Sequence, residues 1–533
     1  MDWRHTTHTS KHICAYSLFL LAMALYIWGL APTISWRDSP EFVTVVHTLG
    51  ISHPAGSPTY TLLAKLLTFL PLGSIALRVN LFSALCGAWC LTCLFSLLYE
   101  YLTETPVWAR LVAALSGALF LLVSASFWRF AEMAEVYTLQ DGLLVVLIAL
   151  LLKARQASPK APSVHTRLYW LFAFLYGLSA GVHATMAFFL PAFIVFSALT
   201  APHMFRSKSL AFLVFFFLLG FASYLYLPLR SLSEPIFDWS NPETFQQFLS
   251  HITDRKDAAT HFTIPTKILP QQIRLYLANL SHEFLALGIV LGLVGCLTIF
   301  AKDKPLFLLL GLVYLGNVGF FVRSWKAAFG FLPSFVIFAV WIGLGVHTCL
   351  RLLATVYQRY PIRIPRVVVT TFLLGGILVT LGQAFTRHVD AANQAENYSA
   401  ELYGTQLLAQ LPSDALLFSH YAWFPLLYLQ HVEQRRPDLT FLAQSEILLP
   451  THFSFLSKKR YPNITLGTST KPVRMSTFDY FWALCRMNQN EHPLFWDADG
   501  YFQTQFDAYL LPQGLLFAFT PGQEVELTPQ VLQ

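Results

Sequence analysis

The first long apolar run of the chain leads directly into its most polar motif, and residues 16–58 read YSLFLLAMALYIWGLAPTISWRDSPEFVTVVHTLGISHPAGSP. An apolar segment of about 20 residues is long enough to cross a lipid bilayer as a helix. The polar part, residues 35–58, contains one arginine, two carboxylates, two histidines and three prolines. This stretch therefore predicts a membrane helix followed by a loop that brings acid and imidazole side chains to the bilayer surface.

The composition of the whole chain agrees with a membrane protein. Of its 533 residues, 55% are hydrophobic and 12% are charged, about half the roughly 25% that is usual for soluble domains. The mean hydropathy is +0.52. Such a chain cannot bury its apolar surface in one soluble core, so we predict a polytopic α-helical membrane protein.

About eleven apolar runs qualify as transmembrane helices. They fall at about 13–34, 75–102, 107–127, 138–153, 167–183, 184–200, 209–229, 280–301, 305–322, 328–349 and 367–386. Residues 59–73 are also apolar, but Pro58 and Pro71 bound a segment that is too short to span. We expect that segment to lie along the membrane interface as an amphipathic helix.

The net charge of +6 does not indicate a nucleic-acid partner, because the basic residues cluster in short loops between apolar runs. These loops are residues 153–167, 203–209 and 351–366, and they share one side of the membrane only if residues 167–200 cross twice. Cytoplasmic loops carry an excess of Lys and Arg, so we place these loops and the N-terminus in the cytoplasm. The segments predicted on the opposite, extracytoplasmic face are the opening motif, residues 128–138, residues 230–278 and the tail from about residue 387.

The tail differs in character from the rest of the chain. Charged residues, proline and glutamine become common, and the apolar runs shorten to strand length. ALLFSH (415–420) and LTFLAQ (439–444) read as short buried strands on either side of a helix. We therefore predict a transmembrane domain over residues 1–386 and a small extracytoplasmic α/β domain over residues 387–533.

Asp38 and Glu41 are the first candidates for catalysis. They are three residues apart, so they share one face of a helical turn. A carboxylate at the membrane edge is partly desolvated, which adjusts its pKa in a way that suits a general base. The alternative is that Asp38 or Ser39 caps a helix that begins at Pro40, and one segment can do both.

Other polar residues lie at the predicted outer ends of the helices. His53 precedes a turn, and residues 127–141 hold Glu132 and Glu135 between two apolar runs. Arg230 ends an apolar helix, where its guanidinium could hold a phosphate with two hydrogen bonds or simply extend to the interface. Residues 251–261 contain histidines and aspartates without metal-ligand spacing, so we assign no metal site.

Several of these motifs, taken in order, resemble the transmembrane-protein-260 family of protein O-mannosyltransferases. The resemblance rests on RDSPEF (37–42), LGISHPAGSPTYTLLAKLL (49–67), ALRVNLFSAL (76–85), AEVYTLQ (134–140), GLSAGVHATM (177–186), YLYLPLRSLSEPIFDWSNPETF (224–245) and LYLQHVEQRRPDLTFL (427–442). It covers roughly the first 250 residues in order and then scattered points to about residue 445. The resemblance depends on polar residues at matching positions, which a chance match in apolar composition would not reproduce.

The resemblance implies a membrane glycosyltransferase of the C superfamily (GT-C), in the bacterial inner membrane or the endoplasmic reticulum membrane. Such enzymes move a sugar, here mannose, from a polyprenyl-phosphate carrier to a protein hydroxyl or glycan acceptor on the extracytoplasmic face. The resemblance makes Asp38 or Glu41 the catalytic base. It places substrate-binding residues at His53, Arg78, Asn80, Glu135, Tyr137, His183 and Arg230. No cofactor is implied beyond the lipid-linked donor, and dependence on a divalent metal stays open.

Two other classes of function fit part of the sequence. A transporter or flippase of a polar solute or lipid-linked sugar would carry ionisable residues at mid-membrane and internal repeats with broken helices, and neither is visible. A structural or assembly protein would use the α/β tail to bind a partner, but it gives the RDSPEF motif no purpose. We therefore favour the lipid-linked sugar transferase.

Overall fold

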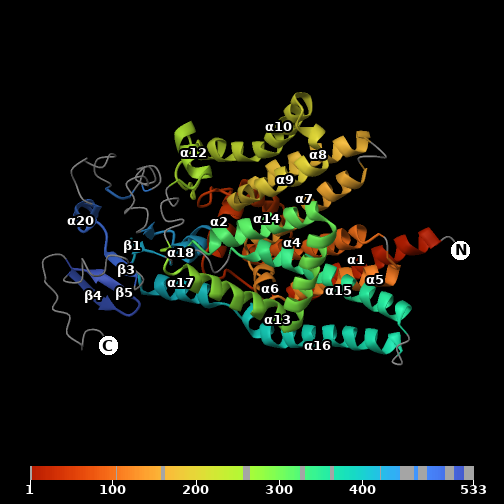
Figure 1. Ribbon diagram of the computed structural model, residues 1–533. Helices are drawn as coiled ribbons and strands as arrows, with labels where there is room; N and C mark the ends of the chain where they lie inside the picture. The colour runs from red at the N-terminus through yellow and green to blue at the C-terminus, as the bar shows by residue number, and fades with distance from the viewer. Residues whose placement is uncertain are drawn as a thin grey trace. The chain divides into compact units, whose positions relative to one another are not determined.

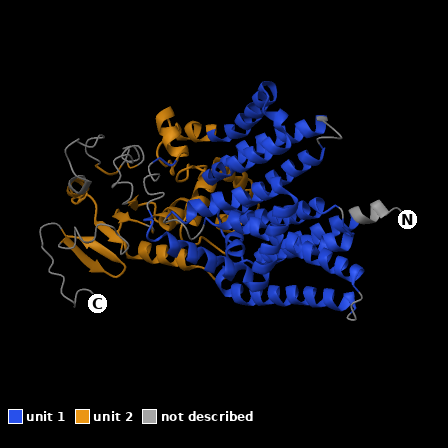
Figure 2. Cartoon of the chain, viewed as in Figure 1, with its two compact units in different colours: residues 1–30, 80–224, 254–395 blue, residues 31–79, 225–253, 396–533 orange. Residues whose placement is uncertain are grey.

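The computed structural model describes residues 3–103, 105–157, 162–255, 264–324, 330–360, 365–420, 422–443, 461, 463–465, 477–497 and 509–520. The chain divides into two compact units, each made of several separate segments (Figure 2). The first unit comprises Met1–Leu30, Asn80–Tyr224 and Asp254–Ala395. The second comprises Ala31–Val79, Leu225–Thr253 and Glu396–Gln533.

Long apolar helices build the first unit (Figure 1). They are α1 (Trp3–Trp28), α4 (Ile75–Tyr101, which begins in the second unit), α5 (Val107–Leu122), α6 (Ala125–Ala131), α7 (Tyr137–Ala157), α8 (Pro162–Ala180), η1 (Ala184–Phe189), α9 (Leu190–Thr200), η2 (Pro202–Phe205), α10 (Ser207–Phe221), η3 (Ala222–Leu225), α13 (Leu269–Lys302), α14 (Lys304–Phe321), α15 (Leu332–Arg359) and α16 (Arg366–Ala392). The predicted polytopic α-helical fold is confirmed.

The described residues include eight helices that are long and apolar enough to cross a membrane. A ninth is reached if α5 and α6, which meet at a bend of 71°, are counted as one span. Residues 167–200 form two helices, as predicted, because the chain breaks between Ala180 and Ala184. The total of eleven spans stays a prediction, because α9, the helix after that break, has only 11 residues.

Close contacts between helix backbones hold this unit together. Gly177 of α8 and Gly220 of α10 each face the backbone of the other helix so closely that a side chain at either position would clash with a carbonyl oxygen. Small residues allow this approach, which membrane helices use because lipid gives little hydrophobic drive for their association. α15 is buried over most of its length and packs against α5 and α13.

The second unit gathers three parts of the chain that the sequence predicts on one face of the membrane. Its helices are α2 (Ser39–Thr48), α3 (Pro58–Leu67), α11 (Tyr226–Ser231), α12 (Phe245–Ile252), α17 (Ser399–Gln410), α18 (Trp423–His431) and α20 (Thr477–Asn488). Helix α18 packs against α2, and the rings of Trp423 and Phe237 meet at 5.2 Å. The tail, through α18, therefore packs against the helix that carries the RDSPEF motif, α2.

A five-stranded sheet forms the end of the tail, in the order β2-β1-β3-β5-β4. The strands are β1 (Leu416–Ser419), β2 (Thr440–Ala443), β3 (Leu494–Asp497), β4 (Leu510–Gln513) and β5 (Leu516–Phe519). β1 pairs in parallel with β2 and β3, while β5 runs antiparallel to β3 and β4. The two predicted strands and the helix between them are confirmed as β1, α18 and β2. The domain boundary at residues 386 and 387 stays a prediction.

The expected amphipathic segment is present as α3, although the helix ends at Leu67 and not at residue 73. Its buried side includes Tyr60 and Ala64, which are fully inaccessible to solvent. Leu66 and Phe69, by contrast, are 61% and 73% exposed. A helix at the membrane interface needs an apolar side that is exposed to lipid, and among the described residues Leu66 and Phe69 provide it. The interfacial position of α3 stays a prediction.

Candidate functional site

The sequence-predicted carboxylates lie at the start of α2. Asp38 is the N-cap residue, Pro40 lies in the first turn, and Glu41 is the acidic residue of that turn. The predicted helix start is thus confirmed, because Pro at the first turn and an acid near the N-terminus both favour it. The side chain of Asp38, however, accepts no backbone N–H of α2. Capping therefore does not account for this carboxylate.

Glu41 is fully buried and binds His53 twice. The backbone N–H of His53 donates to Glu41 Oε1 at 2.6 Å, and His53 Nδ1 lies 2.8 Å from Glu41 Oε2. A buried carboxylate needs such partners, since an unpaired one would be strongly destabilising. These contacts fix the turn after His53 against α2 and leave the Nε2 side of the imidazole turned away from Glu41.

Asp38 completes a cluster with this pair. The ligand atoms of Asp38, Glu41 and His53 all lie within 4.8 Å of one another. Among the described residues this is the one group that could hold a metal ion. This cluster was not predicted, because the spacing of its three residues in the sequence matches no metal motif. Residues 251–261, which we considered for a metal from the sequence and rejected, are a different segment. Of that stretch, 256–261 lie outside the described residues.

Arg230 closes the C-terminal end of α2, a role that the sequence did not indicate. Its Nε donates to the carbonyl of Leu49 at 2.6 Å, and its Nη2 donates to the carbonyl of Thr48 at 3.1 Å. Its Nη1 donates to Ser233 Oγ at 2.9 Å. Lys65 donates to the next carbonyl back, that of His47. Cations belong here because the last carbonyls of a helix lack partners within the helix.

Arg78 is held in the same way by the loop that follows α3. Its three nitrogens donate to the carbonyls of Thr68, Leu72 and Gly73 at 2.7, 2.7 and 2.9 Å. A guanidinium has five N–H donors, so these bonds leave two of them. Phosphate binding by Arg230 or Arg78 stays a prediction. Both side chains also have a structural role, because each one bonds backbone carbonyls.

The remaining predicted site residues lie in the first unit, around the start of α7. Asn80 Oδ1 accepts the backbone N–H of Ala134 at 2.8 Å, and Ser83 Oγ bonds both the N–H and the carbonyl of Glu135 at 3.2 Å. Both side chains come from α4, one turn apart. They hold the segment that presents Glu135, which is itself 4% exposed.

Tyr137 and His183 lie side by side, with ring centroids 5.6 Å apart. His183 caps η1, since its Nδ1 accepts the backbone N–H of Thr185 at 3.3 Å and lies 2.7 Å from the Thr185 hydroxyl. Gln140 also donates to that hydroxyl, at 3.1 Å. The structure thus brings Tyr137 and His183 together, and their role in substrate binding stays a prediction. The cap by His183 also shows how the second helical segment of residues 167–200 begins.

Glu132, which the sequence groups with Glu135, has a different environment. It is fully buried and accepts hydrogen bonds from Trp128 Nε1 and from the backbone N–H of Gln394, the latter at 3.2 Å. It also lies against Gly29, where any side chain would clash with the carboxylate. Glu132 therefore connects the ends of α1, α6 and α16, which is a structural role.

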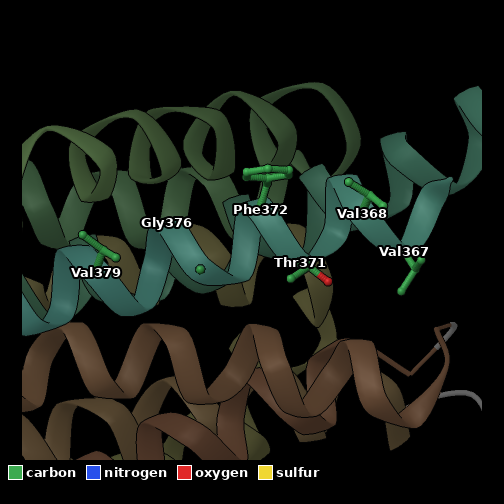
Figure 3. A pocket seen from close by; sticks show the side chains of 7 residues that line it. Val367, Val368, Thr371, Phe372, Gly376 and Val379 are labelled. Atoms are coloured by element: carbon green, nitrogen blue, oxygen red, sulfur yellow. The ribbon is translucent and has the colours of Figure 1, made fainter. Parts of the chain in front are cut away.

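A cavity of about 650 Å³ along α16 is not a candidate for catalysis. Seven residues of that one helix line it, from Val367 to Val379 (Figure 3). Thr371 supplies the only polar side chain of the lining. A groove of this kind suits the acyl chains of lipid around a membrane helix, but it offers no group for acid–base work.

Comparisons with known proteins agree with these observations. Residues 38–204 match the family model for the protein O-mannosyl-transferase TMEM260 N-terminal domain. This range begins at Asp38 and contains every predicted site residue except Arg230. The chain is 26% identical over 517 residues to protein O-mannosyl-transferase TMEM260 of Mus musculus, covering 89% of this chain and 69% of the relative. It is 22% identical over 564 residues to its counterpart in Dictyostelium discoideum, covering 96% and 67%.

The fold has solved neighbours too. ArnT of Cupriavidus metallidurans, in its crystal structure bound to undecaprenyl phosphate, superposes with a TM-score of 0.60 at 14% identity, covering 96% of this chain and 99% of ArnT. The oligosaccharyltransferase of Archaeoglobus fulgidus gives a TM-score of 0.53 at 12% identity, covering 93% and 70%. The predicted resemblance and the GT-C fold are confirmed.

Proposed function

We propose, on the premise that this chain is a membrane glycosyltransferase, that it transfers mannose from a polyprenyl-phosphate carrier to a protein hydroxyl on the extracytoplasmic face. Relatives named protein O-mannosyl-transferases support the premise and the acceptor. A fold neighbour crystallised with undecaprenyl phosphate supports a lipid-linked donor.

The observation that carries the proposal is the cluster of Asp38, Glu41 and His53 at the start of α2. Glu41 is buried and committed to His53. Asp38 is half-buried, and within the described part of the chain its carboxylate accepts no hydrogen bond. A general base must reach the proton that it removes. We therefore assign the base to Asp38, and we assign to Glu41 the task of positioning the loop beside it.

In the proposed reaction the acceptor hydroxyl gives its proton to the Asp38 carboxylate. The hydroxyl oxygen then forms a bond to the anomeric carbon while the bond from that carbon to the phosphate oxygen breaks. The bonding electrons leave with the polyprenyl phosphate. Because phosphate is a good leaving group, the protein mainly supplies orientation and stabilisation of charge. Glu41 has both oxygens engaged by His53, so we expect transfer to proceed without a divalent metal.

Proteoliposomes with a labelled mannosyl polyprenyl phosphate separate this proposal from a flippase. A transferase breaks the bond between sugar and phosphate and leaves polyprenyl phosphate behind, at a rate that depends on an acceptor peptide. A flippase moves the intact lipid between leaflets whether or not a peptide is present. Intact donor that changes leaflet without cleavage would favour the flippase and contradict the proposal.

The proposed orientation can be tested by cysteine labelling in intact cells. Gln156 lies at the C-terminal end of α7, in a basic segment that we place in the cytoplasm, and Glu243 lies in a loop that we place outside; both are exposed. We expect an impermeant thiol reagent to label Glu243→Cys and to leave Gln156→Cys unlabelled until the cells are opened. Labelling is read against the parent chain, which has seven native cysteines. The reverse pattern would place Asp38 on the cytoplasmic side.

Arg230→Lys tests whether this arginine also binds the phosphate of the donor. One ammonium group cannot hold the carbonyls of Leu49 and Thr48 as the planar guanidinium does. We expect a loss of roughly 0.3–1 kcal/mol of stability and a severalfold higher KM for the donor, with the KM for the acceptor unchanged. Arg435→Lys, elsewhere in the second unit, is the control. A lower melting temperature with an unchanged donor KM would confine Arg230 to closing α2, with Arg78 next to be tested.

A further inference from the structure

A polar cavity of about 470 Å³ lies in the first unit at the C-terminal ends of α4, α7, α13 and α15. Arg155 is the residue of α7 that lines the cavity together with Gln156. Arg155 follows Tyr137 by 18 residues, which at about 1.5 Å per residue separates the two by about 27 Å along the helix. The cavity is therefore distinct from the candidate site residues of this unit. Two of the basic segments predicted in the cytoplasm, 153–167 and 351–366, begin at it.

The lining of this cavity has an excess of positive charge. Arg155 donates to both oxygens of Asp303, at 2.8 and 2.7 Å, so the opposite charges of this bidentate pair neutralise each other. Lys302 and Arg351 line the cavity as well. Within the described residues neither cationic group has an ion-pair or hydrogen-bond partner. Two positive charges thus face one cavity without a counter-charge.

The interior of the cavity offers further polar groups. His347 is 9% exposed, and among the described residues its Nε2 has no hydrogen-bond partner. It lies one helical turn before Arg351. The hydroxyl oxygens of Thr298 and Thr348 are 3.1 Å apart on two facing helices. Buried polar atoms in folded proteins are normally paired, so His347 Nε2 is available to hydrogen-bond a polar ligand in the cavity.

The remaining lining is aliphatic. Leu102, Ile299, Leu344 and Leu352 contribute it, and Leu352 is 57% exposed. The cavity therefore combines a cationic, hydrogen-bonding part with an apolar part that is open at the surface of a membrane-spanning unit. A ligand that fits both has an anionic head and an apolar or small remainder.

We propose that this cavity binds an anionic phosphate group, carried either by a membrane lipid or by a small soluble molecule. Arg351 can hold two phosphate oxygens, Lys302 adds a point charge, and the threonine hydroxyls and His347 supply hydrogen bonds. The apolar lining accommodates the acyl chains of a lipid. Anionic lipids are concentrated in the cytoplasmic leaflet, where the predicted topology places the cavity. This proposal does not rest on the proposed transfer reaction, and its test measures lipid binding without measuring sugar transfer.

The test uses the purified full-length protein and native mass spectrometry of retained lipid. Phosphatidylglycerol is compared with phosphatidylcholine, whose choline cation opposes Lys302 and Arg351. The double variant Lys302→Gln/Arg351→Gln removes the two free charges. The control Lys304→Gln/Arg359→Gln also removes one lysine and one arginine charge, but from exposed positions outside the cavity.

We expect the wild-type protein and the control to retain phosphatidylglycerol in preference to phosphatidylcholine. The Lys302→Gln/Arg351→Gln variant should bind phosphatidylglycerol about tenfold more weakly, which is about the size of one charge-assisted hydrogen bond. Displacement of the lipid by millimolar inorganic phosphate would show that soluble phosphates also occupy the site, and no displacement would assign it to lipid. Equal retention of the two lipids, or equal loss in both double variants, would overturn the proposal.

Discussion

We expect Asp38→Asn to lower the turnover of sugar transfer by at least about a hundredfold, the usual contribution of a positioned general base. The amide has nearly the volume of the carboxylate but cannot accept the proton of the acceptor hydroxyl. Because the Asp38 side chain caps no backbone N–H of α2, thermal stability should stay close to that of the wild type. The measurement is steady-state transfer to a peptide together with a melting curve.

Asp390→Asn is the matched control, since Asp390 is an exposed aspartate near the end of α16. It should leave both turnover and melting temperature unchanged. Full turnover in Asp38→Asn would remove Asp38 as the base. A fall in turnover that is matched by a fall in melting temperature would instead assign Asp38 a structural role.

Glu41→Gln has the second largest expected effect, and it differs in kind. The substitution removes the negative charge that faces His53 Nδ1 and leaves an amide in a fully buried position. We expect a loss of about 1–3 kcal/mol of stability, the cost of a buried polar group deprived of its partner. Turnover should fall as well, because the loop beside Asp38 loses its attachment to α2.

A double-mutant cycle with His53→Gln checks this assignment. If Glu41 acts through His53, the two substitutions together should cost less stability than the sum of the single changes. Strict additivity would contradict the pairing. A Glu41→Gln variant that keeps its melting temperature and loses all turnover would exchange the roles of Glu41 and Asp38.

The parts of the fold that depend on local sequence could be predicted. Pro40 and Glu41 mark the start of α2, and the apolar runs ALLFSH and LTFLAQ mark two strands. The break in residues 167–200 followed from the distribution of basic loops. In each case, neighbouring residues or the charge of adjoining loops determine the structure.

The parts that depend on distant contacts could not be predicted. Arg230 bonds carbonyls that precede it by 181 and 182 residues. Nothing near Arg230 in sequence signals that α2 ends beside it, so its role in closing that helix was missed. Glu132 resembled Glu135 as a carboxylate between two apolar runs, and only the packing around Gly29 and Gln394 distinguishes them. The sequence likewise left open whether Asp38 or Glu41 is the base. Our choice of Asp38 depends on the hydrogen bonds between His53 and Glu41, which only the structure shows.

The most direct test of the account is transfer of labelled mannose by the purified protein from a polyprenyl-phosphate donor to a peptide. A threonine-containing peptide is compared with the same peptide carrying alanine, in the presence of a chelator, and the products are identified by mass spectrometry. We predict that the threonine peptide gains one hexose, that the alanine peptide does not, and that Asp38→Asn abolishes most of the product. Donor that remains intact when the threonine peptide is incubated with folded protein would contradict the account.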